Sequence, residues 1–250
     1  MQEQAIRDFF NDIAADYPNR YDPKNVFLHF LHTERLVYAT QGLELNQARM
    51  LDIGAGTGQL YDLLARRSDP SNYLACDIAE NMRLNSRVPE DQYRIGKITE
   101  LELEPASFDL IFMLGVTSYL SRASWQADLQ RIYELLKPGG IYIVTCTHAA
   151  SLDYRIRHAA QRLLPKKWLH KRLVGQGFQT TAYTPEEARQ LLEPYFDIQE
   201  FCWLNQTVSP FNRIFPRWSL RLAHPERKKS KLNYRNRLLS GDFLFRAEKL

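Results

Sequence analysis

An acid and three glycines stand close together in the stretch MLDIGAGTGQLYDLL, which begins at Met50. Asp52 lies in the apolar run that opens the stretch, and a second acid, Asp77, ends the next apolar run of this type. Glycine lets the backbone pass close to a ligand because it has no Cβ atom. A glycine turn between a strand and a helix is typical of nucleotide-binding sites. The glycines, at every second position, are Gly54, Gly56 and Gly58.

The spacing of these glycines argues against two common nucleotide sites. The dinucleotide fingerprint is GxGxxG, and Gln59 occupies the position of its third glycine. A phosphate-binding P-loop needs Gly-Lys followed by Ser or Thr, but Gly96 and Lys97 are followed by Ile98. We therefore expect no P-loop, and an NAD-dependent oxidoreductase is a weaker alternative.

Seven apolar runs rich in β-branched and aromatic residues are the expected strands. Strands that alternate with helical segments imply an α/β fold, a doubly wound, Rossmann-like and mostly parallel sheet with helices on both faces. No ordinary amphipathic helix separates the last two runs, so we expect the last of the seven strands to be antiparallel. The expected strands are 49–53, 73–77, 92–95, 108–114, 141–147, 196–204 and 243–247.

Three helices also have clear sequence signals. Two N-terminal helices are expected at about 4–17 and 25–40. A later helix is expected to begin with Thr184, Pro185 and Glu187, which form a capping box with proline at the first helical position.

Four stretches follow one another in the order seen in a known enzyme family. The sequences LDIGAGTG, YLACDIAENM, SFDLIFMLGV and LLKPGGIYIV lie within about residues 50–147. They resemble the glycine motif, the second strand, the fourth strand and the turn into the fifth strand of class I S-adenosylmethionine-dependent methyltransferases of the small-molecule type. The N-terminal FFNDIAADYPNRY is similar to the segment that leads into the domain in these enzymes. The resemblance implies S-adenosyl-L-methionine (SAM) as cofactor.

The residue types are consistent with this cofactor, which carries an amino acid rather than a phosphate. Asp52 is placed to interact with its ammonium group, and a helix N-terminus near Thr57 favours its carboxylate. Asp77 can accept hydrogen bonds from both ribose hydroxyls, and the alternative is that it merely caps the following helix. The resemblance adds Ile78 and Met82 near the adenosine, and Leu114 with Gly115 along the methionine part. The expected cofactor-binding residues are Asp52, Gly54, Ala55, Gly56, Gly58, Asp77, Ile78, Met82, Ile98, Leu114 and Gly115.

One position departs from the family pattern. The family often has Gly-Asp after the third strand, with the acid reaching the adenine amino group, whereas this sequence has Gly96 and Lys97. Lysine cannot accept that hydrogen bond. We expect backbone groups around Lys97 and Ile98, or another residue, to recognise the adenine.

No catalytic residue is assigned. Methyl transfer from a sulfonium is a direct displacement, so positioning alone can supply much of the catalysis. His148 and Tyr119 follow the fifth and fourth strands, and each is a candidate base or substrate contact with a structural role as the alternative. Tyr17 and Tyr21 are expected either in a lid over the cofactor or as a packed pair.

The cysteines and histidines give no sign of a metal. Cys76, Cys146 and Cys202 lie inside strand-like runs without CxxC spacing, so we expect reduced core residues. His29 and His32 stand three positions apart without a neighbouring cluster of cysteines or carboxylates, so we expect no metal site. No signal peptide and no transmembrane segment are recognisable, and a cytoplasmic location is expected.

Positive charge is concentrated in two segments of the expected single domain 1–250. We divide that domain into a helical lid at 1–45, a cofactor-binding core at 46–149, and substrate-side insertions at 150–183 and 205–241. Residues 151–178 contain seven Lys and Arg against Asp153 alone, and residues 205–241 contain nine against Glu226 alone. Their large apolar residues, expected to form the wall of an acceptor pocket, include Trp168, Phe211, Phe215, Trp218 and Leu220.

These insertions favour a small or lipid-linked acceptor with apolar and anionic parts, or else form a solvated basic surface. RNA is the rival acceptor, because clustered cations and aromatics also suit phosphate backbones. A catalytically inactive protein that only binds the cofactor is a further alternative, and the oligomeric state stays open. Peripheral membrane contact is suggested by one helical face, formed by Leu152, Ile156, Ala160, Leu163 and Leu164.

Overall fold

The structure is a computed structural model that describes residues 2–67, 69–163, 180–207, 211–222 and 238–250. Several residues of the basic insertions therefore lie outside the described residues. They are Leu164, Lys166, Lys167, Trp168, Lys171, Arg172, Arg227, Lys228, Lys229, Lys231, Arg235 and Arg237. The side chains of Ala160, Arg162, Leu163 and Arg213 are likewise not described.

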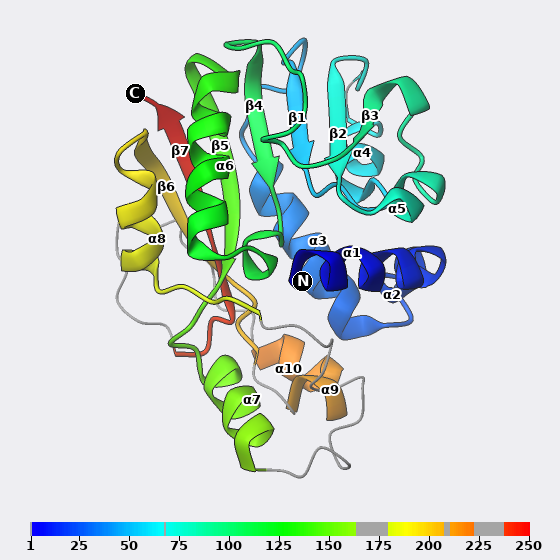
Figure 1. The fold of residues 1–250 in the computed structure, drawn as a ribbon. Coiled ribbons are helices and arrows are strands. Elements are labelled where there is room, and N and C mark those ends of the chain that lie inside the picture. The colour runs from blue at the N-terminus through cyan, green and yellow to red at the C-terminus, as the bar shows by residue number, and fades with distance from the viewer. Residues whose placement is uncertain (1, 68, 164–179, 208–210, 223–237) are drawn as a thin grey trace.

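A seven-stranded sheet with the strand order β3-β2-β1-β4-β5-β7-β6 forms the centre of the molecule (Figure 1). β1 pairs in parallel with β2 and β4, while β7 runs antiparallel to both β5 and β6. The expected α/β architecture with an antiparallel last strand is thus confirmed. The strands are β1 Met50–Ile53, β2 Tyr73–Asp77, β3 Tyr93–Ile95, β4 Phe108–Met113, β5 Leu136–Thr147, β6 Phe196–Leu204 and β7 Asp242–Lys249.

β5 begins five residues earlier than the sequence pattern indicates. Pro138 and the two glycines after it were expected to form a turn, but Leu136 already pairs with Phe108 of β4. The register of this pair shifts between Phe108 and Leu110. The strand therefore accommodates these residues through an irregularity in its pairing with β4.

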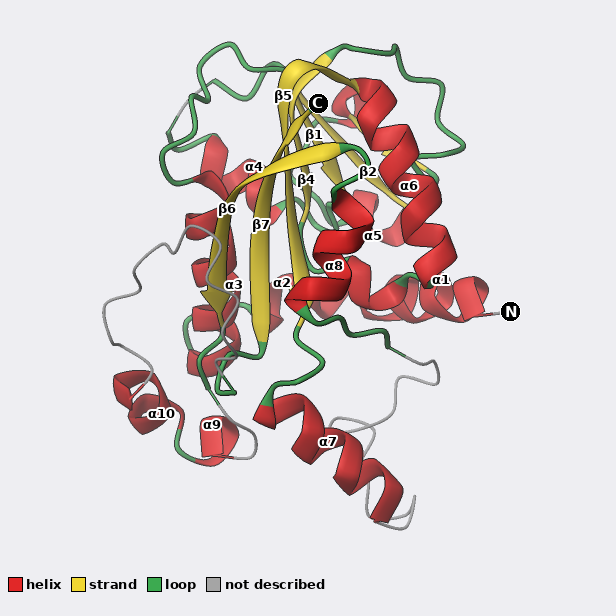
Figure 2. Ribbon diagram, turned by 90° about the vertical axis from the view of Figure 1, so that its left-hand side faces the viewer, coloured by secondary structure: helices red, strands yellow, loops and turns green. Residues whose placement is uncertain are grey.

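Helices cover both faces of the sheet (Figure 2). α6 (Arg122–Leu135) and α8 (Pro185–Leu192) pack on one face, and α3 (Val26–Thr40) and α4 (Gln59–Leu64) pack on the other. α8 begins with the expected capping box, because Thr184 Oγ1 accepts from Glu187 N while Glu187 Oε2 accepts from Thr184 N. None of the helices in the described ranges is long and apolar enough to span a bilayer.

The N-terminal segment is broken into short helices. α1 (Gln2–Ile13) is followed by the 3₁₀ helix η1 (Ala14–Asp16) and by α2 (Tyr17–Arg20), whereas one helix was expected at 4–17. Pro18 occupies the first turn of α2, a position that proline tolerates because its missing N–H is not needed there. The prediction of a single helix is therefore wrong beyond Ile13, where α1 ends.

α1 is held against the loops at the carboxyl ends of β2 and β3. Asn81, in α5 (Glu80–Leu84), donates from its backbone N–H to Asn11 Oδ1 at 3.0 Å. Lys97 Nζ lies 2.5 Å from Glu3 Oε2 of α1. Lys97, which departs from the family pattern, thus contacts the N-terminal helix in this structure.

Both insertions emerge at the carboxyl ends of the parallel strands. α7 (Leu152–Leu163) follows β5, while α9 (Phe211–Ile214) and α10 (Pro216–Leu222) lie between β6 and β7 in sequence. All three helices lie beyond the same end of the sheet (Figures 1 and 2). In α/β sheets this end carries the ligand site.

Candidate active site

The glycine turn after β1 has a backbone conformation that other residues rarely adopt. The φ angles of Gly54, Gly56 and Gly58 are +71°, +55° and +81°. A Cβ atom on Gly54 would clash with the side chain of Val116, whereas one on Gly56 would lie 3.5 Å from the ring of Tyr17. Gly54 therefore permits close packing of the turn, while Gly56 leaves space beside the Tyr17 ring.

Asp77 ties the glycine turn to the end of β2. Its Oδ2 accepts from Gly56 N at 2.9 Å, and its Oδ1 accepts from Ala79 N at 2.9 Å. Burial raises the pKa of Asp77, and these backbone donors act in the opposite direction. Ala79 is the N-cap of α5, so the carboxylate does order the start of that helix, as the capping alternative supposes. Each carboxylate oxygen retains acceptor capacity for a further donor, such as a ribose hydroxyl.

Asp52 is buried at the end of β1 beside the turn. Its Oδ2 accepts a 2.6 Å hydrogen bond from the hydroxyl of Tyr73 in β2. Burial raises the pKa of Asp52 to about 7, Tyr73 opposes this shift, and the nearby charge of Asp77 adds to it. A nearby cation such as an ammonium group would lower the pKa of this carboxyl group and favour the loss of its proton.

A cleft opens between the glycine turn and the N-terminal helices, with a volume of about 420 Å³ that includes its solvent-filled mouth. α2 and α3 supply the outer wall. The cleft is lined by Tyr17, Tyr21, His32, Arg35, Leu36, Asp52, Gly54, Ala55, Gly56, Gln59, Leu60 and Leu114.

The aromatic residues of this wall pack on one another. The Tyr17 and Tyr21 hydroxyls lie 3.1 Å apart, and the Tyr21 ring stacks on His32 with a centroid distance of 4.1 Å. Burial, helped by the charge of Arg35, lowers the pKa of His32 to about 3, so this imidazole is neutral at physiological pH. Tyr17 and Tyr21 thus form the expected packed pair and line the cleft, while their role as a lid over the cofactor stays a prediction.

Arg35 is a charged residue of the cleft that was not predicted from the sequence. Its guanidinium lies so close to Gly115 that a Cβ atom there would clash with it. Arg35 Nη2 lies 3.8 Å from Asp242 Oδ2. Within the described part of the chain, Arg35 Nε has no hydrogen-bond partner. Arg35 and Glu34 are the only Asp, Glu, Lys or Arg residues in the otherwise largely apolar α3, which is a signal that could have drawn attention to them.

Arg35 also changes how positive charge is supplied to the cleft. A helix N-terminus near Thr57 was expected to favour an anion. The structure begins α4 at Gln59 and ends it at Leu64, so this helix is short. A guanidinium carries a full charge and several donors, so Arg35 is the stronger candidate partner for a carboxylate.

The other expected cofactor residues are arranged around the cleft. Leu114 lines it, and Gly115 lies under Arg35. Met82 is buried with Ala14 of η1, and Ile98 is buried in the core cluster on the α6 side of the sheet. Met82 is therefore covered by the N-terminal helices and Ile98 belongs to the core, while Leu114 and Gly115 border the open cleft.

The two candidate bases are placed differently from the cleft residues. His148 is fully buried, its Nδ1 lies 3.0 Å from Ser240 O, and its ring packs against Trp203 at a centroid distance of 4.9 Å. This environment favours the structural alternative for His148. Tyr119 packs edge-on against Phe10 of α1, and burial raises the pKa of Tyr119 to about 12.

The cysteines are buried and free, as expected, while the apolar wall of an acceptor pocket stays a prediction. Phe211, Phe215 and Trp218 are 40%, 53% and 64% exposed, and none of them lines the cleft. The insertion helices turn these side chains outward. The buried free cysteines are Cys76, Cys146 and Cys202.

Comparisons with known proteins agree with this geometry. The methyltransferase-domain family matches residues 51–142. A ubiquinone biosynthesis O-methyltransferase of Xylella fastidiosa is 32% identical over 175 residues, which cover 65% of this chain and 69% of the relative. The chain belongs to the class I SAM-dependent methyltransferases. The match spans 63% of the length of a further relative with the same name, from Xanthomonas euvesicatoria.

Solved structures of other methyltransferases share the fold of this methyltransferase. A SAM-dependent methyltransferase of Thermotoga maritima, described as a possible histamine N-methyltransferase, has a TM-score of 0.67 at 16% identity, covering 98% of this chain and 99% of that one. Magnesium protoporphyrin IX methyltransferase of Synechocystis, solved with bound S-adenosylhomocysteine (SAH), has a TM-score of 0.65 at 13% identity over the whole of both chains.

The residues of this methyltransferase fit SAM as its cofactor. A buried acid at Asp52 and an arginine with an unpartnered Nε among the described residues face one cleft, as an ammonium and a carboxylate require. Asp77 accepts from Gly56 N of the glycine turn, and its oxygens can accept further hydrogen bonds, as ribose hydroxyls require. We expect Asp52 and Arg35 to bind the amino-acid part of SAM and Asp77 to bind its ribose.

The raised pKa of Asp52 predicts a pH-dependent cost in stability. The folded chain keeps a proton that the unfolded chain releases, so stability is lost as pH rises from about 4 to about 7. Between about pH 5.5 and 8 the ionisation of this group should lower the free energy of unfolding by about 2 kcal/mol, at about 1.4 kcal/mol per pKa unit. Asp52→Asn should lack this loss, because the amide has no proton to titrate, and its oxygen can still accept from Tyr73 so that the fold is kept. Chemical denaturation at both pH values measures the difference.

The same substitution should weaken cofactor binding. Ionised Asp52 is the form that attracts an ammonium group, so wild-type affinity for SAH should rise about tenfold from about pH 6 to 8. Asp52→Asn should bind SAH more weakly at pH 8 and show a flat profile. Equal pH profiles of wild type and variant would place the ammonium elsewhere.

Proposed function

We propose that this methyltransferase methylates a hydroxyl group of a small amphipathic acceptor, with a lipid-linked molecule as the favoured class. The observation that carries this proposal is the position of the cleft. Its outer wall is α3, and α10 packs against the same helix, so the cleft adjoins a surface that is both apolar and cationic. The name of the ubiquinone biosynthesis relatives supports oxygen as the methylated atom.

The residues of the chain would orient the reactants and exclude water. When bound, SAM would supply a methyl group: the acceptor oxygen forms a bond to the methyl carbon as the bond from that carbon to sulfur breaks, SAH leaves, and the hydroxyl proton passes to water. Asp52 and Arg35 would fix the amino-acid part, and α1 and α2 would cover the adenosine. Tyr17 and Tyr21 would shield the reacting centre from solvent. Positioning of this kind supplies a large part of the rate in direct displacements.

The acceptor can be identified without a guess at its structure. The purified protein is incubated with a cell extract and SAM that carries a deuterated methyl group. The extract is then divided into organic-soluble, aqueous small-molecule and RNA fractions for mass spectrometry. We expect the labelled methyl group in an organic-soluble molecule, bound through oxygen.

The control reaction uses Asp77→Ala, which should not bind the cofactor and should leave the label in SAM. Label in RNA or only in polar metabolites would contradict the proposed acceptor class. Absence of label from every fraction, with normal SAH binding, would support a protein that binds the cofactor without methyl transfer.

A further inference from the structure

Exposed apolar side chains are concentrated at the end of the molecule that carries the insertions. Among the described residues, all the large hydrophobic side chains classed as exposed lie there except Leu84, Ile95 and Leu250. Isolated exposed hydrophobics are normal in soluble proteins, but a contiguous set usually marks an interaction site. This clustering of exposed apolar side chains therefore indicates a surface that binds a partner.

The helices α9 and α10 present one part of this set. Ile214 and Trp218 are 63% and 64% exposed, Phe215 is 53% exposed, and the Phe211 and Phe215 rings lie 5.7 Å apart. We name Phe211, Ile214, Phe215 and Trp218 the α9–α10 patch. These are large side chains of the kind that enter the boundary between lipid headgroups and acyl chains.

The opposite side of these two helices is fixed to the rest of the protein. Asn212 and Ser219 are 2% and 3% exposed. Asn212 Nδ2 donates to Thr207 Oγ1 at 3.1 Å, and Thr207 Oγ1 donates to Asn205 Oδ1 at 2.7 Å just after β6. The α9–α10 patch thus points away from a buried polar anchor.

A second group of exposed apolar side chains lies where α7 begins. Leu152 and Ile156 of α7 are 39% and 37% exposed, and Leu238 and Leu239 are 49% and 54% exposed. The backbone N–H of Leu152 donates to Leu238 O at 2.6 Å, so these two segments are adjacent. The expected amphipathic face of this helix is present in its described N-terminal part.

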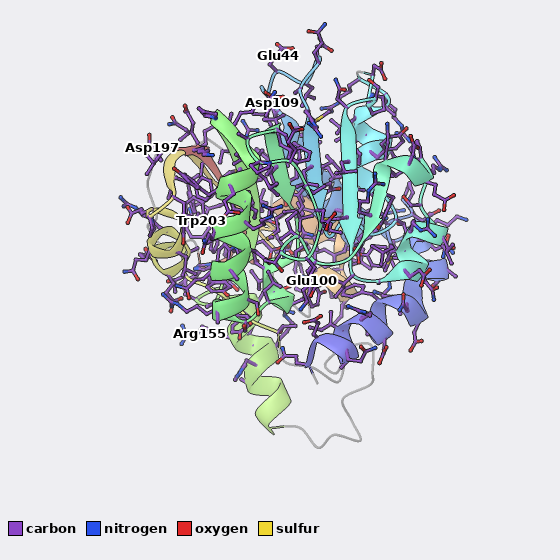
Figure 3. All side chains as sticks on the ribbon, turned by 45° about the horizontal axis from the view of Figure 1, so that its top comes forward. Glu44, Glu100, Asp109, Arg155, Asp197 and Trp203 are labelled. Atoms are coloured by element: carbon purple, nitrogen blue, oxygen red, sulfur yellow. The ribbon has the colours of Figure 1, made fainter. Side chains whose placement is uncertain are left out.

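Positive charge accompanies both groups. Arg217 and Arg221 on α10 and Arg155 on α7 are exposed. Figure 3 shows Arg155 at the start of α7, while Glu44 and Asp109 lie at the opposite end of the molecule. This distribution would orient the insertion end toward an anionic surface.

We propose that the α9–α10 patch docks on the surface of a phospholipid bilayer that contains anionic lipids. Trp218 and the two phenylalanines would enter the interface between headgroups and acyl chains, and Arg217 and Arg221 would contact lipid phosphates. A second copy of this chain is disfavoured, because two such cationic surfaces repel each other. Ile214 of the patch and the four aliphatic side chains of the second group, Leu152, Ile156, Leu238 and Leu239, offer no stacking surface for bases, which favours lipid over RNA. The inference rests on surface placement and not on the identity of the methyl acceptor.

Vesicle flotation of the full chain tests the proposal. The protein is mixed with vesicles of phosphatidylcholine alone or of phosphatidylcholine with phosphatidylglycerol. We expect wild type to float with the mixed vesicles and to bind phosphatidylcholine alone at least about tenfold more weakly, since several arginines each favour the anionic surface. The fluorescence of Trp218 should shift to shorter wavelength with the mixed vesicles, and this shift should disappear in Trp218→Phe.

Two pairs of variants separate the apolar and the charged contributions. Phe215→Ser/Trp218→Ser should lose flotation, whereas Leu84→Ser, which removes an exposed leucine from α5, should float as wild type. Arg217→Glu/Arg221→Glu should lose binding to the mixed vesicles, whereas Arg66→Glu/Arg87→Glu, with the same change in net charge, should retain most of it. Unchanged SAH affinity shows that each variant is folded.

Failure of wild type to float with either vesicle overturns the proposal. Equal flotation of the α9–α10 variants and their matched controls also overturns it. If the protein shifts the gel mobility of an RNA oligonucleotide but does not float with vesicles, the surface is assigned to nucleic acid instead. None of these outcomes depends on methyl transfer, so they are distinguishable from failure of the proposed function.

Discussion

Asp77→Ala is expected to lower the affinity for SAH about 100-fold or more, because hydrogen bonds to a charged group contribute about 1.5–3 kcal/mol each and two ribose hydroxyls are involved. The substitution also removes the acceptor that holds Gly56 N, so the glycine turn keeps only the backbone bonds of Gly54 N and Ala55 N to Cys76 O of β2. Isothermal titration calorimetry measures the change. The affinity for 5′-methylthioadenosine, which shares the ribose but lacks the amino-acid part, should fall by a similar factor.

The main alternative is that Asp77 acts only as the cap of α5. In that case Asp77→Ala would lower the thermal unfolding temperature through the lost bond to Ala79 N but would leave SAH affinity intact. Asp91→Ala, which removes an exposed acid from the 3₁₀ helix η2 (Glu90–Gln92), is the matched control and should change neither quantity.

Arg35→Gln is expected to weaken SAH binding about 50-fold, because a guanidinium forms strong charge-assisted hydrogen bonds to a carboxylate. Binding of 5′-methylthioadenosine should stay unchanged, since that molecule has no carboxylate. The two ligands therefore separate Arg35 from Asp77, whose loss should weaken both. Titration calorimetry with each ligand makes the comparison.

Arg35→Lys keeps the charge but loses the fork of donors, and it should recover part of the SAH affinity. Arg189→Gln removes an exposed arginine of α8 and serves as the control. If Arg35→Gln lowers the affinity for both ligands by a similar factor, Arg35 supports the fold of the cleft through Asp242 and does not bind the carboxylate.

The sequence by itself determined the elements whose signals are local. The bounds of β2 and β6 were predicted to the residue, because β2 is a short apolar run that ends at an acid and β6 alternates apolar and polar residues before an apolar end. The start of α8 followed from its capping box, which involves side chains three positions apart. The glycine turn could likewise be predicted, since its three positive φ angles require glycine at fixed spacing.

Only the tertiary structure decided which distant residues meet at the cleft. At the cleft, Arg35 of α3 lies beside Asp242 of β7, and outside it Glu3 of α1 pairs with Lys97 in the loop after β3. Periodicity and capping describe neighbours along the chain, so they contain no information on such pairs. The burial of His148 and the outward direction of Trp218 depend in the same way on packing between segments far apart in sequence. Local patterns thus specified the strands and the turn, while the partners of the buried charges followed from how the helices pack on the sheet.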